Sequence, residues 1–214
     1  MGKQLNGGKE RPTGIGGTDA IRIVEGKWKE LWLEKIGETE RADLSDVLPV
    51  QLGIFTEKFN RQWYQKVTGE RVVSLDKIWK HPQIDFIYGS LDGITNGKVW
   101  EGKHTNPFGS EGKILDKYYP QLQHYMLVTG LSEAILSVII GNMNYKIFKV
   151  KKDEEFIQHL LKAETLFWNF VTTRMVPPDF MEFNKLKEIK DAKDIIELFG
   201  IEISEEAWIQ RTLN

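Results

Sequence analysis

The chain has 214 residues, of which 41% are hydrophobic and 11% aromatic, enough for one globular domain with a sizeable core and too apolar for a disordered protein. It contains no cysteine, which excludes disulfides, cysteine-ligated zinc or iron–sulphur sites and a cysteine nucleophile. The absence of a signal peptide and of an apolar run of membrane-spanning length predicts a soluble, cytoplasmic protein with no membrane partner. The formal net charge of −2 means that nucleic-acid binding would require a locally basic surface.

Composition predicts three parts. Residues 1–10 are polar and contain glycine, as expected for a flexible leader. Residues 11–178 carry the helical and strand patterns and form the predicted domain. Residues 179–214 are charged and weakly helical, which is typical of an interaction arm or a loosely packed tail, and their role is unassigned.

The domain begins with a glycine-rich segment that runs from Arg11 to Thr18 and Asp19 and is followed by an apolar run. This order predicts a loop entering a helix, with Thr18 or Asp19 as the N-cap. The first N–H groups of the helix, the Thr18 hydroxyl and the Arg11 guanidinium could bind a phosphate, but a simple capped helix explains the same residues. The segment lacks the Gly-Lys-Ser/Thr ending of a Walker A loop.

Two amphipathic helices are predicted next. The first begins near Trp28 and is stopped by Gly37, and the second covers about residues 50–67. On the second helix Glu57 precedes Arg61 by four residues, a spacing typical of an exposed ion pair. The alternative is that the Glu57 carboxylate leans over a metal site.

Residues 89–105 are interpreted as two strands joined at Asn96-Gly97, a dipeptide that tolerates the positive φ of a tight hairpin turn. Alternation along the second strand places Glu101 and Lys103 on one face. If Asp92 ends the first strand on that face, two carboxylates and an ammonium converge, as in a Mg²⁺ site with a lysine that orients water. A turn and a solvated Glu-x-Lys pair explain the same residues equally well.

The pattern after residue 105 predicts a loop over 106–117 and then a helix with Pro120 in its first turn and Gly130 at its end. On this helix Gln121 and Tyr125 share a face, which suggests a polar site, because buried polar groups need partners. The remaining expected elements are a central apolar strand, an alternating strand and a long helix, at residues 134–140, 145–150 and about 154–174.

Taken together, these segments resemble the phage lambda exonuclease and YqaJ-type viral recombinase nucleases of the PD-(D/E)xK superfamily. The resemblance covers roughly residues 11–178. Five motifs carry it, in the order of that family: Arg11…Gly-Ile-Gly-Gly-Thr18-Asp-Ala; Gly53-x-x-x-Glu57; His81-Pro82…Ser90-Leu-Asp92-Gly-Ile; Glu101-Gly-Lys103; and Tyr119-Pro-Gln121-Leu-Gln123-His-Tyr125-Met. It implies an α/β fold, a mixed sheet flanked by helices around a restriction-endonuclease-like nuclease core.

The resemblance also implies the catalytic machinery. Asp92, Glu101 and the backbone carbonyl of Gly102 become ligands of Mg²⁺, and Glu57 completes the position of a second ion, with Mn²⁺ as a substitute. Lys103 becomes the active-site lysine. Gly102 departs from the family, which often has a β-branched or long apolar residue there, and this predicts weaker packing behind the strand.

For the substrate, the resemblance matches Arg11 and Thr18 to the residues that hold the terminal 5′-phosphate. It matches Gln121 and Tyr125 to a Q-x-x-x-Y motif, with Gln121 near the lysine or the DNA backbone. The implied activity is Mg²⁺-dependent 5′-to-3′ exonucleolysis of double-stranded DNA ends to mononucleotides. The implied assembly is a homotrimer around a DNA channel, and phage recombination would add a single-strand annealing protein as a partner.

Two other hypotheses stay open. A PD-(D/E)xK endonuclease, or a RecB-like nuclease module, would share the carboxylates and the lysine but would not need Arg11 and Thr18. A catalytically inactive DNA-binding protein on a decayed nuclease fold is expected to have lost one of the four catalytic residues, and all four are present here.

Overall fold

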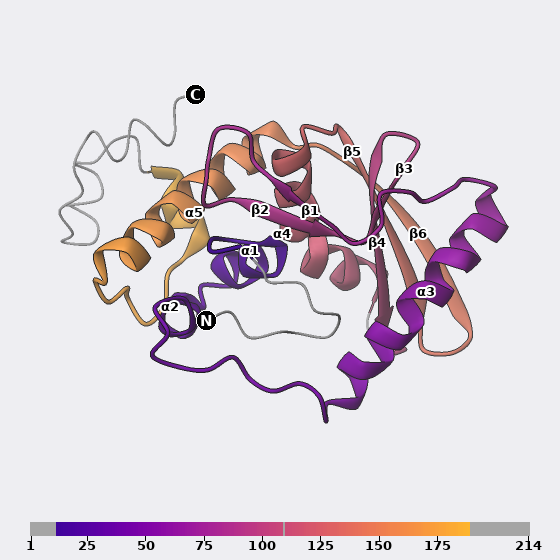
Figure 1. Ribbon diagram of the computed structural model, residues 1–214, viewed down its shortest axis with the longest axis horizontal. Helices are drawn as coiled ribbons and strands as arrows, with labels where there is room; N and C mark the ends of the chain where they lie inside the picture. Colours follow the sequence, from indigo (N-terminus) through magenta and orange to yellow (C-terminus); the bar gives the residue numbers. More distant parts are fainter. Residues whose placement is uncertain (1–11, 109, 189–214) are drawn as a thin grey trace.

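The computed structural model describes residues 12–108 and 110–188. Its centre is a mixed four-stranded sheet in the order β3-β4-β5-β6, in which only the β4–β5 pair is parallel. Strands β1 and β2 form a separate antiparallel pair. The strands are β1 (Lys77–Lys80), β2 (Tyr88–Leu91), β3 (Gly93–Thr95), β4 (Lys98–Thr105), β5 (Glu133–Ile140) and β6 (Asn144–Lys151). The predicted mixed sheet flanked by helices is therefore confirmed (Figure 1).

Helices cover both faces of the sheet. In Figure 1, α3 lies on one side, while α1, α4 and α5 gather on the other. A short 3-10 turn, η1, follows α5. The helical elements are α1 (Gly17–Val24), α2 (Trp28–Lys35), α3 (Leu48–Thr68), α4 (Glu111–Thr129), α5 (Glu154–Thr173) and η1 (Phe183–Glu188).

Each face of the sheet has its own apolar core. On the α3 side, Trp100 and Ile135 pack with Tyr64, whereas on the α4 side Val99 and Leu136 belong to a separate, larger cluster. This division follows from the alternation of side chains along a strand. Glu101 and Lys103, in phase with Val99, are therefore directed to the α4 side.

The predicted hairpin turn is confirmed, because Asn96 and Gly97 have φ values of 46° and 73°. The strand that precedes the turn is interrupted. Asp92 separates β2 from β3, and the two strands pair with different partners. β3 lies opposite only the first part of β4, so no strand among the described residues adjoins the edge of β4 from Glu101 onward on that side.

Two local predictions were wrong. The N-cap of α1 is Gly16, because the Asp19 carboxylate sits in the third helical position and accepts a hydrogen bond from the Gly16 N–H at 2.9 Å. The predicted loop over 106–117 is partly helix, since the Ser110 hydroxyl caps α4 by accepting from the N–H of Lys113. Pro120 consequently lies inside α4, although proline is commonest in a first turn.

The part of the predicted tail that the structure describes is packed. Met181 and Leu186 are buried in the same cluster as Trp28, Phe167 and Phe170. Within the described residues, no helix combines the length and the apolar character needed to span a membrane. The predicted leader, residues 1–10, and Arg11 lie outside the described residues, as do residues 189–214.

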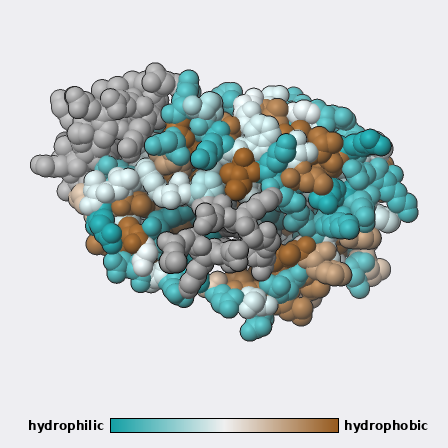
Figure 2. All heavy atoms as spheres, in the orientation of Figure 1, coloured by the Kyte–Doolittle hydropathy of each residue, from teal (hydrophilic) through white to brown (hydrophobic). Residues whose placement is uncertain are grey.

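The start of α3 carries an exposed apolar patch, defined by Leu48, Phe55 and Phe59, whose exposed fractions are 67%, 82% and 54%. Apolar residues are gathered at the corresponding edge of the surface in Figure 2. Exposed apolar patches of this kind commonly mark interaction surfaces.

Candidate active site

A cavity of about 190 Å³ opens among the start of α1, the connection after α2, and elements β2, β4 and α4. It brings together six of the residues selected from the sequence, namely Thr18, Asp92, Glu101, Lys103, Gln121 and Tyr125. It also adds residues that the sequence analysis did not assign to the site, namely Gly16, Gly17, Asp19, Arg41, Tyr88 and Ser90.

Asp92 is held at the open edge of β4. Its Oδ2 atom accepts a hydrogen bond from the N–H of Gly102 at 3.0 Å. In an extended strand the N–H and C=O of one residue face the same edge, so the Gly102 carbonyl is directed toward Asp92 as well. Burial is the main cause of a raised pKa at Asp92, and the nearby Lys103 ammonium opposes it.

Glu101 has two different carboxylate oxygens. Oε1 accepts hydrogen bonds from Lys103 Nζ at 2.6 Å and from Gln121 Nε2 at 2.9 Å. Oε2 is buried and has no hydrogen-bond partner among the described residues. Burial, followed by the charge of Asp92, raises the pKa of Glu101 to about 8. If Glu101 and Asp92 were both ionised, the cavity would hold two negative charges beside the one positive charge of Lys103.

Lys103 stays a cation in this environment. Burial acts to lower its pKa, but the carboxylates of Glu101 and Asp92 outweigh burial and raise the pKa above its usual value. The ammonium also lies 5.2 Å from the ring centre of Tyr118, within cation–π range.

Gln121 and Tyr125 join α4 to the site. Gln121 Nε2 lies 2.9 Å from both Glu101 Oε1 and the hydroxyl oxygen of Tyr125. The Tyr125 hydroxyl in turn donates to the Ser90 carbonyl at 2.9 Å. The predicted shared face is confirmed, and these contacts connect helix α4 to strands β2 and β4.

Glu57 does not line the cavity, but its negative charge contributes to the raised pKa of Glu101. Burial, followed by Asp92 and Asp76, raises the pKa of Glu57 to about 7, and Arg61 contributes only a smaller opposing effect. The described residues contain no group of three His, Asp or Glu side chains close enough to hold one metal ion. The structure therefore brings Asp92 and Glu101 together and leaves Glu57 beside them.

These groups suit a divalent cation. Asp92, the unpartnered Oε2 of Glu101 and the Gly102 carbonyl are hard oxygen donors, which Mg²⁺ and Mn²⁺ prefer. Two protein carboxylates with several waters are a common Mg²⁺ arrangement. A bound cation would also offset the burial of both carboxyls, which is the main cause of their raised pKa values.

The expectation of weak packing behind β4 was wrong. A Cβ atom built on Gly102 would lie 2.8 Å from Cη2 of Trp100, so the indole already occupies the space that a side chain would need. Trp100 is fully buried. The residue two positions earlier therefore fills the place of the larger side chain that the family often has.

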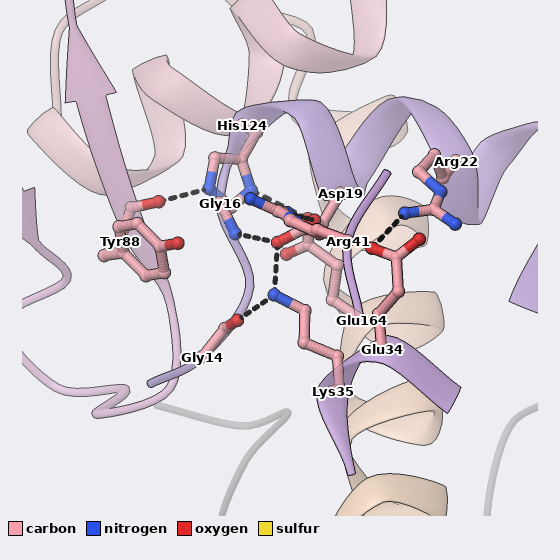
Figure 3. Close-up of polar contacts among 10 residues, drawn as sticks. All are labelled: Gly14, Gly16, Asp19, Arg22, Glu34, Lys35, Arg41, Tyr88, His124 and Glu164. Carbon is pink, nitrogen blue, oxygen red and sulfur yellow. Dashed lines mark hydrogen bonds and ion pairs between the residues drawn. The ribbon is translucent and has the colours of Figure 1, made fainter. Parts of the chain in front are cut away.

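A charged cluster adjoins the cavity around Asp19 (Figure 3). The Asp19 carboxylate is 2% exposed and receives Lys35 Nζ at 2.6 Å and Arg41 Nη2 at 3.1 Å. Burial acts to raise the pKa of Asp19, but the two cations and the Gly16 N–H outweigh it and hold the pKa below its usual value. Sequence reasoning gave Asp19 a capping role only and missed Arg41, which lies in a polar connection with no periodic pattern.

The buried side chain of His124 contacts strand β2 beside the site. His124 Nδ1 lies 2.7 Å from Glu164 Oε1, and its Nε2 lies 2.8 Å from the Tyr88 carbonyl oxygen (Figure 3). Burial acts to lower the pKa of His124, but Glu164 and the Tyr88 carbonyl outweigh it and raise the pKa. Both ring nitrogens face oxygen acceptors, which favours the doubly protonated imidazolium.

The fold resembles that of solved exonuclease structures. An alkaline exonuclease from Laribacter hongkongensis has a TM-score of 0.60 and 18% identity over 82% of this chain and 92% of its own chain. A phage-related exonuclease from Haemophilus somnus 129PT has a TM-score of 0.60 and 11% identity over 76% of this chain and 96% of its own. The first enzyme has also been solved in complex with dAMP.

Residues 9–132 match the YqaJ-like viral recombinase domain, and this span is more than half of the chain. The chain therefore belongs to the YqaJ-like viral recombinase family, as its motifs predicted. It is 31% identical over 172 residues to the uncharacterized protein YqaJ of Bacillus subtilis, a match that covers 75% of this chain and 54% of that protein. The chain thus spans about half the length of this relative.

Proposed function

We propose that this protein is a divalent-metal-dependent deoxyribonuclease that degrades double-stranded DNA from its ends, 5′ to 3′, to mononucleotides. The observation that carries the proposal is the Glu101 carboxylate, with Oε1 held by Lys103 and Gln121 and Oε2 buried without a partner beside Asp92. Membership of the viral recombinase family and the fold shared with solved exonucleases support it.

In this proposal Asp92, Glu101 and the Gly102 carbonyl hold Mg²⁺ or Mn²⁺, and Glu57 contributes to a second ion. A divalent cation held there would activate a water molecule for attack and would neutralise charge on the phosphate. Lys103 orients the attacking water and balances charge that develops on the phosphate oxygens. Gln121 holds Glu101 in place, because ordered partners behind a ligand fix its orientation.

End recognition is assigned to Arg11 and Thr18, with DNA backbone contacts from Gln121 and Tyr125. Thr18 supports this assignment because it lies in the cavity at the start of α1, where N–H groups without intrahelical acceptors attract anions. Arg11 precedes Thr18 by seven residues in the sequence.

The proposal also includes a homotrimer and a single-strand annealing partner. The exposed apolar patch at the start of α3 supports self-association. Light scattering after size exclusion tests the trimer, and a Phe55→Ser variant tests the patch. A monomer at micromolar concentration would reject both the trimer and the role of the patch in self-association.

The activity is tested by digestion of linear duplex DNA with Mg²⁺ or Mn²⁺, comparing 5′-phosphorylated, 5′-hydroxyl and closed circular substrates. We expect mononucleotides from linear DNA, faster digestion of phosphorylated ends and intact circles. Nicked or linearised circles would favour the endonuclease alternative. The absence of cleavage with either metal would favour an inactive DNA-binding protein.

A further inference from the structure

Arg41 places a guanidinium on the wall of the cavity. It comes from the connection between α2 and α3, and its side chain is 35% exposed. Its Nη2 donates to Asp19 Oδ1 at 3.1 Å, and its Nε donates to Glu34 Oε2 at 3.4 Å (Figure 3). Two contacts from different edges of the planar group fix its orientation.

These contacts leave the guanidinium able to bind a further anion. An arginine side chain has five N–H donors, and the hydrogen bonds within the described residues use two of Arg41's. Asp19 is shared with Lys35 at 2.6 Å, and Glu34 is shared with Arg22 at 2.8 Å. Arg22 also lies 4.0 Å from Glu30, so three cations and three carboxylates balance in the cluster. Arg41 therefore shares both of its carboxylates with another cation, and its remaining N–H donors are available to an anion in the cavity.

The other groups around the cavity indicate what anion this is. Gly17 and Thr18 form the start of α1 beside Arg41, and their N–H groups have no intrahelical acceptor. Asp92 and the unpartnered Oε2 of Glu101 lie in the same cavity and suit a cation. A ligand that fits both walls is an anion that also meets a bound metal ion. A phosphate has this chemistry, and a guanidinium fork matches two of its oxygens.

We infer that Arg41 binds a phosphate of a nucleotide strand in this cavity, and that Asp19 and Glu34 are positioning residues for its guanidinium. The choice of a nucleotide as ligand rests on the proposed function. The phosphate is either the terminal monoester of the strand or an internal diester, and both present the same oxygens to Arg41.

Binding of dAMP and of deoxyadenosine, which differ only in the phosphate, tests this inference by calorimetry at low salt without metal. Arg22→Ala is the matched control, because Arg22 contacts the same Glu34 but does not line the cavity. We expect Arg41→Ala to weaken dAMP binding by about tenfold or more, Arg41→Lys to weaken it less, and Arg22→Ala to change it by less than about twofold. Deoxyadenosine binding should not change.

Equal dAMP affinity in Arg41→Ala and Arg22→Ala, or no dAMP binding by the wild type at millimolar concentration, would overturn the inference. Thermal melting of each variant checks its folding, and Arg41→Lys keeps the test valid if Arg41→Ala unfolds. With duplex DNA, Arg41→Ala should also make the slope of log affinity against log salt concentration less steep by about one unit, the change expected for the loss of one phosphate contact.

Two duplexes identify the source of the phosphate. If Arg41 binds the terminal monoester, Arg41→Ala weakens binding only to a 5′-phosphorylated end, whereas an internal diester predicts the same loss on 5′-hydroxyl ends.

Failure of the inference and failure of the proposed function give different experimental results. Metal-dependent DNA hydrolysis with Arg41→Ala equal to Arg22→Ala rejects only the inference. Arg41-dependent dAMP binding without hydrolysis under any divalent cation rejects only the proposed function.

Discussion

The contact between Trp100 and Gly102 makes the strand of the candidate site sensitive to a single added methyl group. A Cβ atom on Gly102 would lie 2.8 Å from Cη2 and 3.2 Å from Cζ3 of Trp100. The indole is fully buried and packs with Tyr64 and Ile135, so it cannot swing into solvent. Overpacking of this kind costs about 1–3 kcal/mol. We therefore expect Gly102→Ala to lower the melting temperature by about 2–4 °C for each kcal/mol lost.

The assay is urea and thermal unfolding of Gly102→Ala beside Gly112→Ala. Gly112 lies in the first turn of α4, and a Cβ atom there would have no heavy atom within 4 Å. The same methyl group should therefore leave stability unchanged at Gly112 or raise it by up to about 1 kcal/mol.

A second change separates overpacking from other causes. Trp100→Phe shortens the ring, and it removes no hydrogen bond, because the indole Nε1 is buried without a partner among the described residues. In a double-mutant cycle, Gly102→Ala should cost less in the Trp100→Phe background than alone. Equal unfolding free energies for the Gly102 and Gly112 variants would refute the packing argument.

Three further predictions concern the site and its support. Lys103→Ala should lower cleavage by about 10²–10³-fold with DNA binding unchanged, and wild-type turnover would remove Lys103 from the mechanism. Gln121→Leu should raise the Mg²⁺ concentration needed for activity by about 10–100-fold, because Glu101 Oε1 loses a donor. Gln123→Leu, which changes a buried glutamine that bonds Lys151 and Asp153, should leave that requirement unchanged. His124 has a raised pKa, so its stabilising effect relative to His124→Gln should be full below about pH 6.5 and decline as pH rises through the folded pKa. Urea unfolding at several pH values measures this, and a difference that grows with pH would exclude the charged imidazole.

Local geometry explains what the sequence determined by itself. Alternation along a strand places Glu101 and Lys103 on one face in any fold, and helical periodicity does the same for Gln121 and Tyr125. The positive φ values tolerated by Asn96-Gly97 predict the turn before Glu101. These features depend on residues a few positions apart, and the order of the motifs then identified the family.

Contacts between distant segments were decided only by the tertiary structure. Arg41, in the connection after α2, contacts Asp19 at the start of α1 across 22 residues, and no periodic pattern in the sequence encodes that contact. Asp19 was interpreted as an N-cap because the same acidic residue suits either position near a helix start. The space behind Gly102 is filled by the indole of Trp100, and the orientation of that indole cannot be predicted from either residue type. Side-chain packing sets these contacts, so they follow from the complete fold.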